Sequence, residues 1–178
     1  MSLGLVALVL LLLGLALRWW VRRDRAHIGL PAGRVIYADT NNHGHPRDAL
    51  VSYHYGLSGR PDYVVKTREG LVPVEIKTGQ APPRPHEGHV LQLVAYCLLV
   101  EETTGQRPTH GLIRYADRAF RVDYTPELRA ALLQTLTWMR ADLVAATVAR
   151  SHNQPARCRR CGYRQVCGQA LPVNGNDQ

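Results

Sequence analysis

The chain has 178 residues, enough for one domain of ordinary size with a real hydrophobic core. Its formal net charge is +8 and its basic residues are mostly arginines, which favours partners that carry phosphate, although solubility alone would also account for the charge. Three of the four cysteines cluster near the C-terminus, and the fourth is alone in an apolar run. Their distribution excludes the disulfide framework of a small secreted protein and favours metal ligation in a reducing compartment.

The N-terminal stretch is predicted to be a membrane segment. Leu3–Leu17 carry no charge, and Trp19 and Trp20 extend the apolar run towards the ~20 residues that span hydrocarbon. No basic segment precedes the run and no small-residue cleavage site follows it, which favours an uncleaved anchor over a signal peptide. We therefore predict a single-pass protein of the cell inner membrane, with a transmembrane helix over residues 1–22, a juxtamembrane linker over residues 23–33 and a cytoplasmic C-terminal domain.

Beyond the linker, strands are indicated by short runs of β-branched and aromatic residues, and helices by longer apolar runs. Thr125-Pro126-Glu127 is a good helix start, because it offers a cap, a proline at the first helical position and an acid in the first turn. Asp39–Arg47 is polar and is expected to be a loop. The predicted strands are Arg34–Ala38, Leu50–Tyr55, Asp62–Thr67, Leu71–Thr78, Thr109–Tyr115 and Ala119–Tyr124, and the predicted helices are His89–Thr104 and Pro126–Arg150.

These elements predict an α/β fold in which helices cover a mixed central sheet. A single domain over residues 34–168 contains all of them. It includes a Cys-rich segment over residues 158–167, which we expect to bind a metal, and residues 169–178 are expected to be a disordered tail.

Asp62, Glu75 and Lys77 are the candidate catalytic residues. Residues two apart in a strand project from the same face, so Glu75 and Lys77 are expected to point together. If the strand that begins at Asp62 pairs beside them, two carboxylates and one amine converge at a place where a divalent metal and a phosphodiester could be held. The intervening residues are expected to point into the core: Val72, Val74 and Ile76.

A polar pair interrupts the helix that follows. Gln92 and Tyr96 are four residues apart and share one helix face in an otherwise apolar run. A glutamine in such a run needs a buried polar partner or a cleft, and a metal-and-phosphate cleft would supply one. A fully buried helix, with Gln92 bonded to a backbone carbonyl, is the alternative.

Taken together, these motifs resemble the RecB-like branch of the PD-(D/E)XK nucleases. They are Gly59-x-x-Asp62, Glu75-x-Lys77 and Gln92-x-x-x-Tyr96, in this order, with Thr78-Gly79 and a C-terminal Cys158-x-x-Cys161-x5-Cys167. Within that branch the chain is similar to the CRISPR-associated exonuclease family Cas4 and to the nuclease domain of Dna2-type helicases. The similarity covers roughly Leu50 to Gly168 and implies a restriction-endonuclease-like fold.

The resemblance also implies roles for these residues. Asp62 and Glu75 would be metal ligands together with the Ile76 carbonyl, and such hard oxygen ligands favour Mg²⁺ or Mn²⁺. Lys77 would orient the attacking water and offset charge on the phosphate, while Gln92 and Tyr96 would position DNA or the lysine. The pattern also places a histidine upstream of the aspartate.

Three histidines are available for that position: His43, His45 and His54. We favour His43 or His45, although an exposed loop position without a metal contact is the more ordinary interpretation of each.

The family's four-iron, four-sulfur cluster uses one cysteine early in the domain and three late in it. Cys158, Cys161 and Cys167 match the last three, but no cysteine precedes Cys97, so the fourth ligand is not identified. Cys97 lies in the apolar helix and is expected to be a small core residue. Zinc held by the same three cysteines with His152, or a segment without metal, are the alternatives.

We therefore predict a Mg²⁺- or Mn²⁺-dependent DNA nuclease. The resemblance alone implies an exonuclease that acts in CRISPR adaptation and antiviral defence with other CRISPR adaptation proteins. The predicted anchor would bring such DNA processing to the membrane. Two alternatives remain open: a non-catalytic, membrane-tethered DNA-binding or scaffold protein, and a nuclease of the same fold that acts on RNA.

Overall fold

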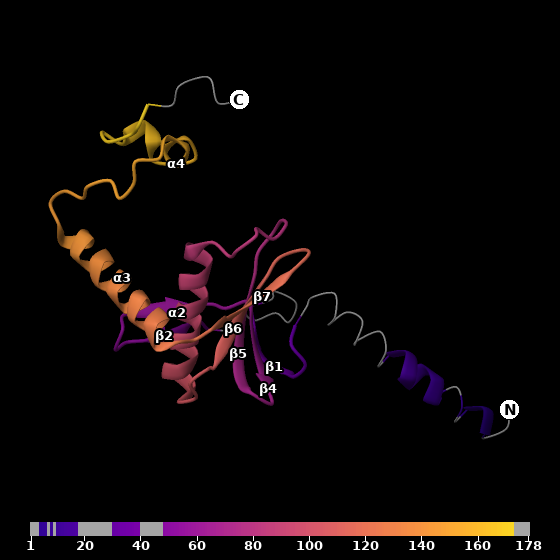
Figure 1. Cartoon of the computed structure of the whole chain (residues 1–178). Helices are drawn as coiled ribbons and strands as arrows, with labels where there is room; N and C mark the ends of the chain where they lie inside the picture. Colours follow the sequence, from indigo (N-terminus) through magenta and orange to yellow (C-terminus); the bar gives the residue numbers. More distant parts are fainter. Residues whose placement is uncertain (1–3, 7, 9, 18–29, 40–47, 173–178) are drawn as a thin grey trace. The chain divides into compact units, whose positions relative to one another are not determined.

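The computed structural model describes residues 4–6, 8, 10–17, 30–39 and 48–172 (Figure 1). The chain divides into two compact units, Met1–Leu133 and Gln134–Gln178. The first unit contains the central sheet, its covering helix and the proposed catalytic residues, whereas the second contains the three C-terminal cysteines.

A mixed five-stranded sheet forms the centre of the first unit, in the order β1-β4-β5-β6-β7. Its strands are β1 (Arg34–Ala38), β4 (Tyr63–Thr67), β5 (Gly70–Ile76), β6 (His110–Arg114) and β7 (Ala119–Asp123). Within this sheet β5 and β6 run parallel, whereas the other neighbouring pairs are antiparallel. This arrangement confirms the predicted α/β class with a mixed sheet and the predicted hairpin of β6 and β7.

The β4–β5 hairpin brings the two acidic motifs together. Tyr63 pairs with Val74 and Thr67 pairs with Gly70, so the residue before β4 lies beside the end of β5. Gly70 has a φ of 113°, a left-handed conformation that favours glycine at this turn. The predicted pairing of these strands is therefore confirmed.

The sheet is buried on both faces along β5. Leu71 packs with Val64, Tyr37 and Val100 on the side of the long helix α2 (Glu87–Thr104). Val72 and Val74 pack with Val65 on the opposite face, where Leu30 and Val35 cover them. Each such side chain contributes roughly 1.5–3 kcal/mol when fully buried.

Helix α2 contacts β2, β3, β5 and β6, which explains why its middle is apolar around most of its circumference. Two glycines allow this close approach. A β carbon at Gly111 would lie 2.7 Å from a side-chain carbon of Leu93, and one at Gly59 would lie 2.9 Å from a ring carbon of Tyr96. Neither position has room for a larger residue unless the helix moves.

The predicted strand over Leu50–Tyr55 is shorter than expected. The structure forms β2 (Leu50–Ser52), a turn, and β3 (Leu57–Gly59), which pair in a separate two-stranded sheet. The strand β3 was not predicted, because three residues are too few for a recognisable alternation. The hairpin packs on α2 and delivers Gly59 to the position beside Tyr96.

Helix α3 (Pro126–Val144) begins as predicted, since Leu128 donates its backbone N–H to the Thr125 hydroxyl at 3.3 Å. It ends six residues earlier than the predicted boundary at Arg150. Leu143 and Val144 are more than four-fifths exposed. Without tertiary packing, the apolar residues that follow do not extend the helix. The second unit continues with α4 (Pro155–Arg159) and a short 3₁₀ helix, η2 (Arg164–Val166).

The predicted transmembrane helix over residues 1–22 was wrong, and so was the predicted inner-membrane location. Residues 4–6, 8 and 10–17 are helical. In the described part of the chain, no helix combines the length and the hydropathy needed to cross a bilayer, which takes ~20 residues. A charge-free run alone was therefore an insufficient sign of a membrane anchor.

Several sequence expectations fall outside the described residues. They include the loop that carries His43 and His45, most of the linker over residues 23–33, and the last six residues of the predicted tail. The domain boundaries derived from the sequence stay predictions.

Candidate active site

Asp62 and Glu75 converge at the end of β5, beside its parallel neighbour β6. The Asp62 carboxylate accepts the backbone N–H of Ile76 at 2.6 Å, which ties the residue before β4 to the last residue of β5. Glu75 is 6% exposed and therefore buried at the edge of the core. The two carboxylates are near enough for the charge on Asp62 to raise the pKa of Glu75.

Lys77 and Gln92 complete a network around Glu75. Lys77 Nζ donates to Glu75 Oε1 at 2.9 Å and to Gln92 Oε1 at 2.7 Å. Gln92 Nε2 donates to Glu75 Oε1 at 2.8 Å and to the Tyr96 hydroxyl at 2.8 Å. An ammonium can only donate and a carboxylate only accepts, so the neighbours fix the orientation of the Gln92 amide. The structure thus brings together all five side chains that the sequence selected.

Burial is the largest cause of the raised pKa of Glu75, and the Asp62 carboxylate raises it further. Hydrogen bonding and the positive charge of Lys77 act in the opposite direction but do not cancel these effects. One ammonium therefore faces two carboxylates in a partly buried place. An additional cation at this point would offset the remaining like-charge repulsion.

The donor chemistry fits a hard divalent cation. Two carboxylates and a nearby backbone carbonyl are oxygen ligands of the kind Mg²⁺ and Mn²⁺ prefer, and Mg²⁺ usually keeps several waters of its own. Across the described residues, no group of three or more His, Cys, Asp or Glu side chains is placed to hold a metal ion. Among the described side chains, Asp62 and Glu75 would therefore be the ligands, with backbone, water and phosphate at other positions.

Two sequence expectations at this site need correction or stay untested. The Ile76 side chain was expected to point into the core, but it is 38% exposed, because β5 ends there beyond the core layer. His54 lies exposed in the turn between β2 and β3 and stacks edge-on against Tyr55. An upstream histidine in the metal site therefore stays a prediction for His43 and His45.

The second unit contains the other predicted site. Cys158 is buried and its sulfur accepts the backbone N–H of Leu171 at 3.4 Å, whereas Cys161 and Cys167 are exposed. All three are free thiols of the soft kind that binds iron or zinc, but as placed they do not converge on one point. Cys97 is buried in the first unit, where burial raises the pKa of its thiol to about 12, as expected of a core residue.

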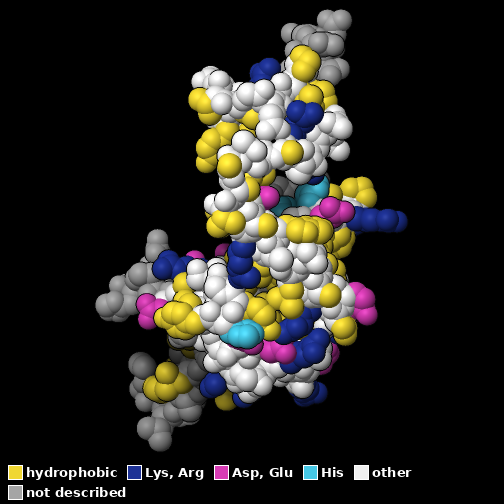
Figure 2. All heavy atoms as spheres, turned by 90° about the vertical axis from the view of Figure 1, so that its left-hand side faces the viewer, with side chains coloured by type: hydrophobic (Ala, Val, Ile, Leu, Met, Phe, Trp, Pro, Cys, Tyr) yellow, Lys and Arg dark blue, Asp and Glu magenta, His cyan; other side chains and the backbone are white. Residues whose placement is uncertain are grey.

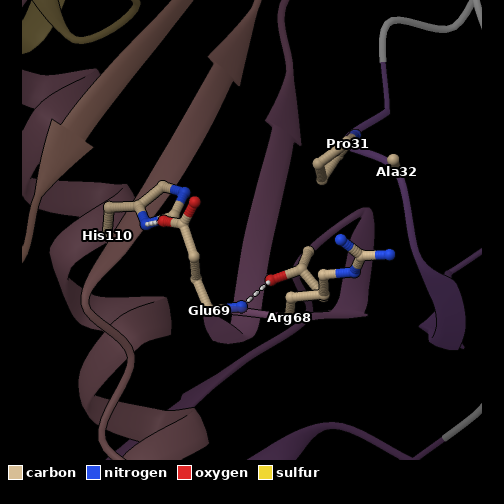
Figure 3. Close-up of a pocket in the computed structure, with 6 residues that line it drawn as sticks. Pro31, Ala32, Arg68, Glu69 and His110 are labelled. Atoms are coloured by element: carbon tan, nitrogen blue, oxygen red, sulfur yellow. Dashed lines mark hydrogen bonds and ion pairs between the residues drawn. The ribbon is translucent and has the colours of Figure 1, made fainter.

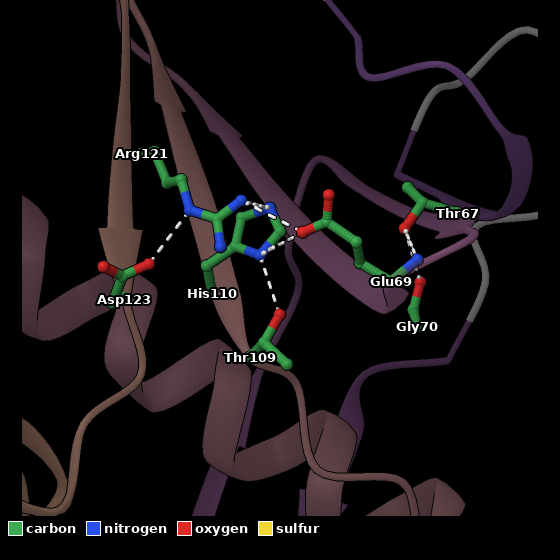
Figure 4. A network of polar contacts seen from close by, with 7 residues as sticks. All are labelled: Thr67, Glu69, Gly70, Thr109, His110, Arg121 and Asp123. Atoms are coloured by element: carbon green, nitrogen blue, oxygen red, sulfur yellow. Dashed lines mark hydrogen bonds and ion pairs between the residues drawn. The ribbon is translucent and has the colours of Figure 1, made fainter.

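A second polar cluster lies at the opposite end of β5 and β6 (Figure 4). Arg121 donates to Asp123 at 2.9 Å and to Glu69 at 3.1 Å, and His110 lies between them with its Nδ1 2.9 Å from the Thr109 hydroxyl. The three charged side chains are at least half exposed. Each charge here has an opposite neighbour.

A cavity of about 400 Å³ opens beside this second cluster (Figure 3). Glu69 reaches towards the His110 ring, and Pro31 and Ala32 form another wall. Thr67, Glu69 and His110 are already paired with their neighbours, and the Glu69 carboxylate opposes the binding of an anion although Arg68 also lines the cavity. We therefore assign the cavity no function. On the face in Figure 2, basic and acidic side chains alternate in small groups, so the net charge is not gathered there into one field.

Sequence reasoning missed three residues that support the site. Gly59 was noted only as part of a motif, whereas its missing side chain makes room for Tyr96. His89 and Tyr115 were not selected, although His89 Nδ1 lies 2.7 Å from the Tyr115 hydroxyl one helical turn from Gln92. Their signals were the spacing of His89 to Gln92 on one helix face and the place of Tyr115 directly after a strand.

The sequence profile of the PD-(D/E)XK nuclease superfamily matches residues 5–168 of this chain. The chain is 28% identical over 120 residues to the CRISPR-associated exonuclease Cas4 of Francisella tularensis subsp. novicida. This match covers 67% of this chain and 60% of that protein. The match therefore includes the strands and the helix that carry the residues described above.

Two other relatives are longer. The chain is 35% identical over 147 residues to a CRISPR-associated exonuclease Cas4/endonuclease Cas1 fusion of Myxococcus xanthus, covering 76% of this chain and 25% of that protein. It is 27% identical over 151 residues to a fusion of the same description from Leptospira interrogans, covering 76% of this chain and 27% of that protein. The chain thus spans only part of the length of the relatives it matches.

Proposed function

Because this chain belongs to the PD-(D/E)XK nuclease superfamily and is a distant homologue of the CRISPR-associated exonuclease Cas4, we propose that it is a metal-dependent deoxyribonuclease that trims DNA from an end. The observation that carries the proposal is the convergence of Asp62 and Glu75, with Lys77 and Gln92 bonded to the same glutamate oxygen. This cluster is buried enough to make its excess negative charge costly, which is the condition under which a cation binds.

Each residue has a distinct role in this proposal. Asp62, Glu75 and the Ile76 carbonyl hold Mg²⁺ or Mn²⁺, and Lys77 orients the attacking water and offsets charge on the phosphate. Gln92 fixes Lys77, because it accepts from the ammonium while it donates to the glutamate that the ammonium also contacts. Tyr96 supports the Gln92 amide from the other side. When bound, the metal would acidify its water and stabilise charge on the non-bridging oxygens.

We propose that the C-terminal unit also binds a metal. Three thiols within one short segment, one of them buried, support either a four-iron, four-sulfur cluster or zinc. The three cysteines leave the fourth ligand of either metal unidentified. For zinc, His152 is the residue available as that ligand. Anaerobic purification followed by metal analysis and an absorption spectrum distinguishes iron–sulfur, zinc and an unmetallated segment.

Two of the relatives support a proposal about partners, because they are Cas4/endonuclease Cas1 fusions. We propose that this chain acts with a separate Cas1-type endonuclease in the processing of DNA for CRISPR adaptation. Co-purification of the two proteins at equal stoichiometry would support this, and their separate elution at micromolar concentrations would contradict it.

The test of the activity is cleavage of end-labelled DNA by the full chain with Mg²⁺, Mn²⁺ or EDTA. Single-stranded, double-stranded and circular DNA, with RNA of the same sequence, define the substrate. The proposal predicts loss of labelled ends from linear DNA with either metal, and no cleavage by the Asp62→Ala or Lys77→Ala variants, which should retain DNA binding. Binding without cleavage under all metal conditions would instead favour a non-catalytic DNA-binding protein, and cleavage of RNA alone would favour an RNA-directed nuclease.

A further inference from the structure

A second polar contact crosses from the sheet to α2 beside the contact between Lys77 and Gln92. Tyr115 follows β6 directly, and its hydroxyl lies 2.7 Å from His89 Nδ1. Lys77 reaches Gln92 with the same separation, 2.7 Å, from the strand next to it. The two contacts join the same pair of structural layers at the carboxyl ends of the two parallel strands, which is where open α/β sheets bind ligands.

Strand register places Tyr115 beside Lys77. Glu75 pairs with Ile113, and Lys77 donates its backbone N–H to the Arg114 carbonyl at 2.7 Å. Since alternate residues of a strand share a face, Tyr115 lies on the same face as Ile113, Glu75 and Lys77. This face is the one that α2 covers, because Ile113 and Tyr115 pack with its Leu93.

Helix periodicity places His89 beside Gln92. The two residues are three apart in α2, so their β carbons are about 5–6 Å apart on one surface of the helix. Tyr96 continues the same row on the far side of Gln92. His89 is partly exposed and its ring meets the exposed His86 ring edge-on, with ring centres 5.2 Å apart. The row therefore runs from the buried Tyr96 outward to solvent.

The surroundings of His89 favour the neutral imidazole. Burial, followed by the charges of Lys77 and His86, lowers the pKa of His89. A neutral ring whose Nδ1 accepts the Tyr115 hydroxyl proton carries its own proton on Nε2. The Tyr115 hydroxyl is able to donate to Nδ1 or to accept from it. We take the form in which it donates, which leaves Nε2–H as the group that can donate to another molecule. A phosphate oxygen, which only accepts, is the complementary partner.

We propose that His89 contacts the DNA substrate by donating its Nε2–H to a phosphate oxygen next to the phosphate that faces Asp62 and Glu75. Tyr115 is the positioning residue that fixes the orientation of the ring. The inference rests on the proposed function, because it takes DNA as the substrate. The opening turn of α2 adds partial positive charge on the same side, although Glu87 in that turn partly opposes it.

The test uses two amides that each replace one nitrogen of the imidazole. In His89→Asn the amide lies near the former Nδ1 and can still bond to Tyr115, whereas in His89→Gln it lies near the former Nε2. Affinity for a fluorescent single-stranded DNA is measured with the full chain by anisotropy in Ca²⁺, with the DNA shown to be intact on a gel. Cleavage in Mg²⁺ is measured in parallel, and melting temperature reports folding.

The proposal predicts that His89→Asn weakens DNA affinity by about tenfold and that His89→Gln weakens it by no more than about threefold. Tyr115→Phe should weaken it by about threefold in the wild-type background, with no further loss in His89→Asn, since it acts only through the imidazole. His110→Asn is the control. His110 begins β6, the strand that Tyr115 follows, and its replacement should leave DNA affinity within about twofold.

The opposite ranking, with His89→Gln at least as weak as His89→Asn, or full affinity in both variants, would overturn the inference. These outcomes are separate from the fate of the proposed nuclease. A wild-type protein that binds DNA but does not cleave it refutes the nuclease, yet the ranking of the His89 variants still decides the DNA contact. A wild-type protein that binds no DNA refutes both.

Discussion

Two polar clusters occupy opposite ends of the parallel strands β5 and β6, and they arrange their charges in different ways. At the beginning of the strands, Arg121 pairs with Asp123 and Glu69, and all three side chains are at least half exposed. At the end of the strands, Asp62 and Glu75 are directed at each other, and Glu75 is 6% exposed. Each cluster has one cation and two carboxylates. In the first, Arg121 contacts both carboxylates, whereas in the second Lys77 contacts Glu75 and the Asp62 carboxylate accepts a backbone N–H.

We infer from this difference that the first cluster is structural and that the second is the proposed catalytic site. Exposed ion pairs are worth about 0–1 kcal/mol each and need no further partner. A buried pair of like charges is unfavourable by itself and is retained where a cation or a reaction uses it. Residue types alone do not distinguish the clusters, since both contain acidic residues beside a basic one and a histidine nearby. Burial distinguishes them, and so does the contact that each carboxylate makes with the cation of its cluster.

The largest expected effect is on catalysis. Lys77→Ala should reduce DNA cleavage by at least about 10²–10³-fold, because it removes a group that offsets charge on the reacting phosphate and orients the attacking water. The matched change in the other cluster, Arg121→Ala, should leave cleavage within about twofold. Initial rates with saturating Mn²⁺ measure both. Equal losses in the two variants would show that the clusters do not differ in function.

The next effect concerns the packing that supports the site. Gly59→Ala places a β carbon 2.9 Å from a ring carbon of Tyr96, so the ring or the β2–β3 hairpin must move. Such overpacking should lower the free energy of unfolding by about 1–3 kcal/mol and disturb the bond from Tyr96 to Gln92. Urea unfolding measures the first and the cleavage rate the second. Gly88→Ala, in open space on α2, is the control: it should leave the cleavage rate unchanged and should not lower the free energy of unfolding, since alanine favours the helix.

A smaller effect follows from the raised pKa of Glu75. The native state binds this proton more tightly than the unfolded state, so without metal the free energy of unfolding should fall as pH rises from about 4.5 through the raised native pKa. Glu75→Gln should remove this decrease and make the stability of the metal-free protein less sensitive to pH. Urea unfolding in EDTA between pH 4.5 and 8 tests this. If the free energy of unfolding rises more steeply with pH in wild type than in Glu75→Gln, the raised pKa of Glu75 is contradicted.

The smallest effect belongs to the other cluster and has the opposite sign. Burial, and then the Arg121 guanidinium, lowers the pKa of His110, so the unfolded state binds that proton more tightly. Stability from His110 should be present above about pH 6.5 and be lost as pH falls through the lowered native pKa. His110→Gln should flatten this dependence slightly. The measurement is the melting temperature at pH 7.5 and at pH 5.5, whose difference should be smaller in the variant than in wild type. An unchanged slope would show that His110 does not titrate differently on folding.

Much of the site was predictable because its spacing is local. The alternation of Glu75 and Lys77 along one strand and the four-residue step from Gln92 to Tyr96 place each pair on one face whatever the rest of the fold does. The turn at residues 68–70 then brings Asp62 beside Glu75. Periodicity and a short hairpin were therefore sufficient for the five selected side chains.

The remaining features depend on contacts between distant segments. Tyr115 and His89 meet only because β6 is the parallel neighbour of β5, and no local pattern indicates that register. The short strand β3 forms only against β2 and α2. The membrane anchor was predicted wrongly because the length of the apolar run was taken as the length of a helix, and no described helix is long and apolar enough to cross a bilayer. Long-range pairing and packing decide these features.

The most direct test of the central claim is a titration of the full chain with Mn²⁺, followed by electron paramagnetic resonance, in wild type and in two single variants. The claim predicts that wild type binds Mn²⁺ and that Asp62→Asn weakens this binding by at least about tenfold, while Glu69→Gln, at the other end of β5, leaves it unchanged. Undiminished Mn²⁺ binding in Asp62→Asn would contradict the claim that Asp62 and the buried Glu75 form the metal site.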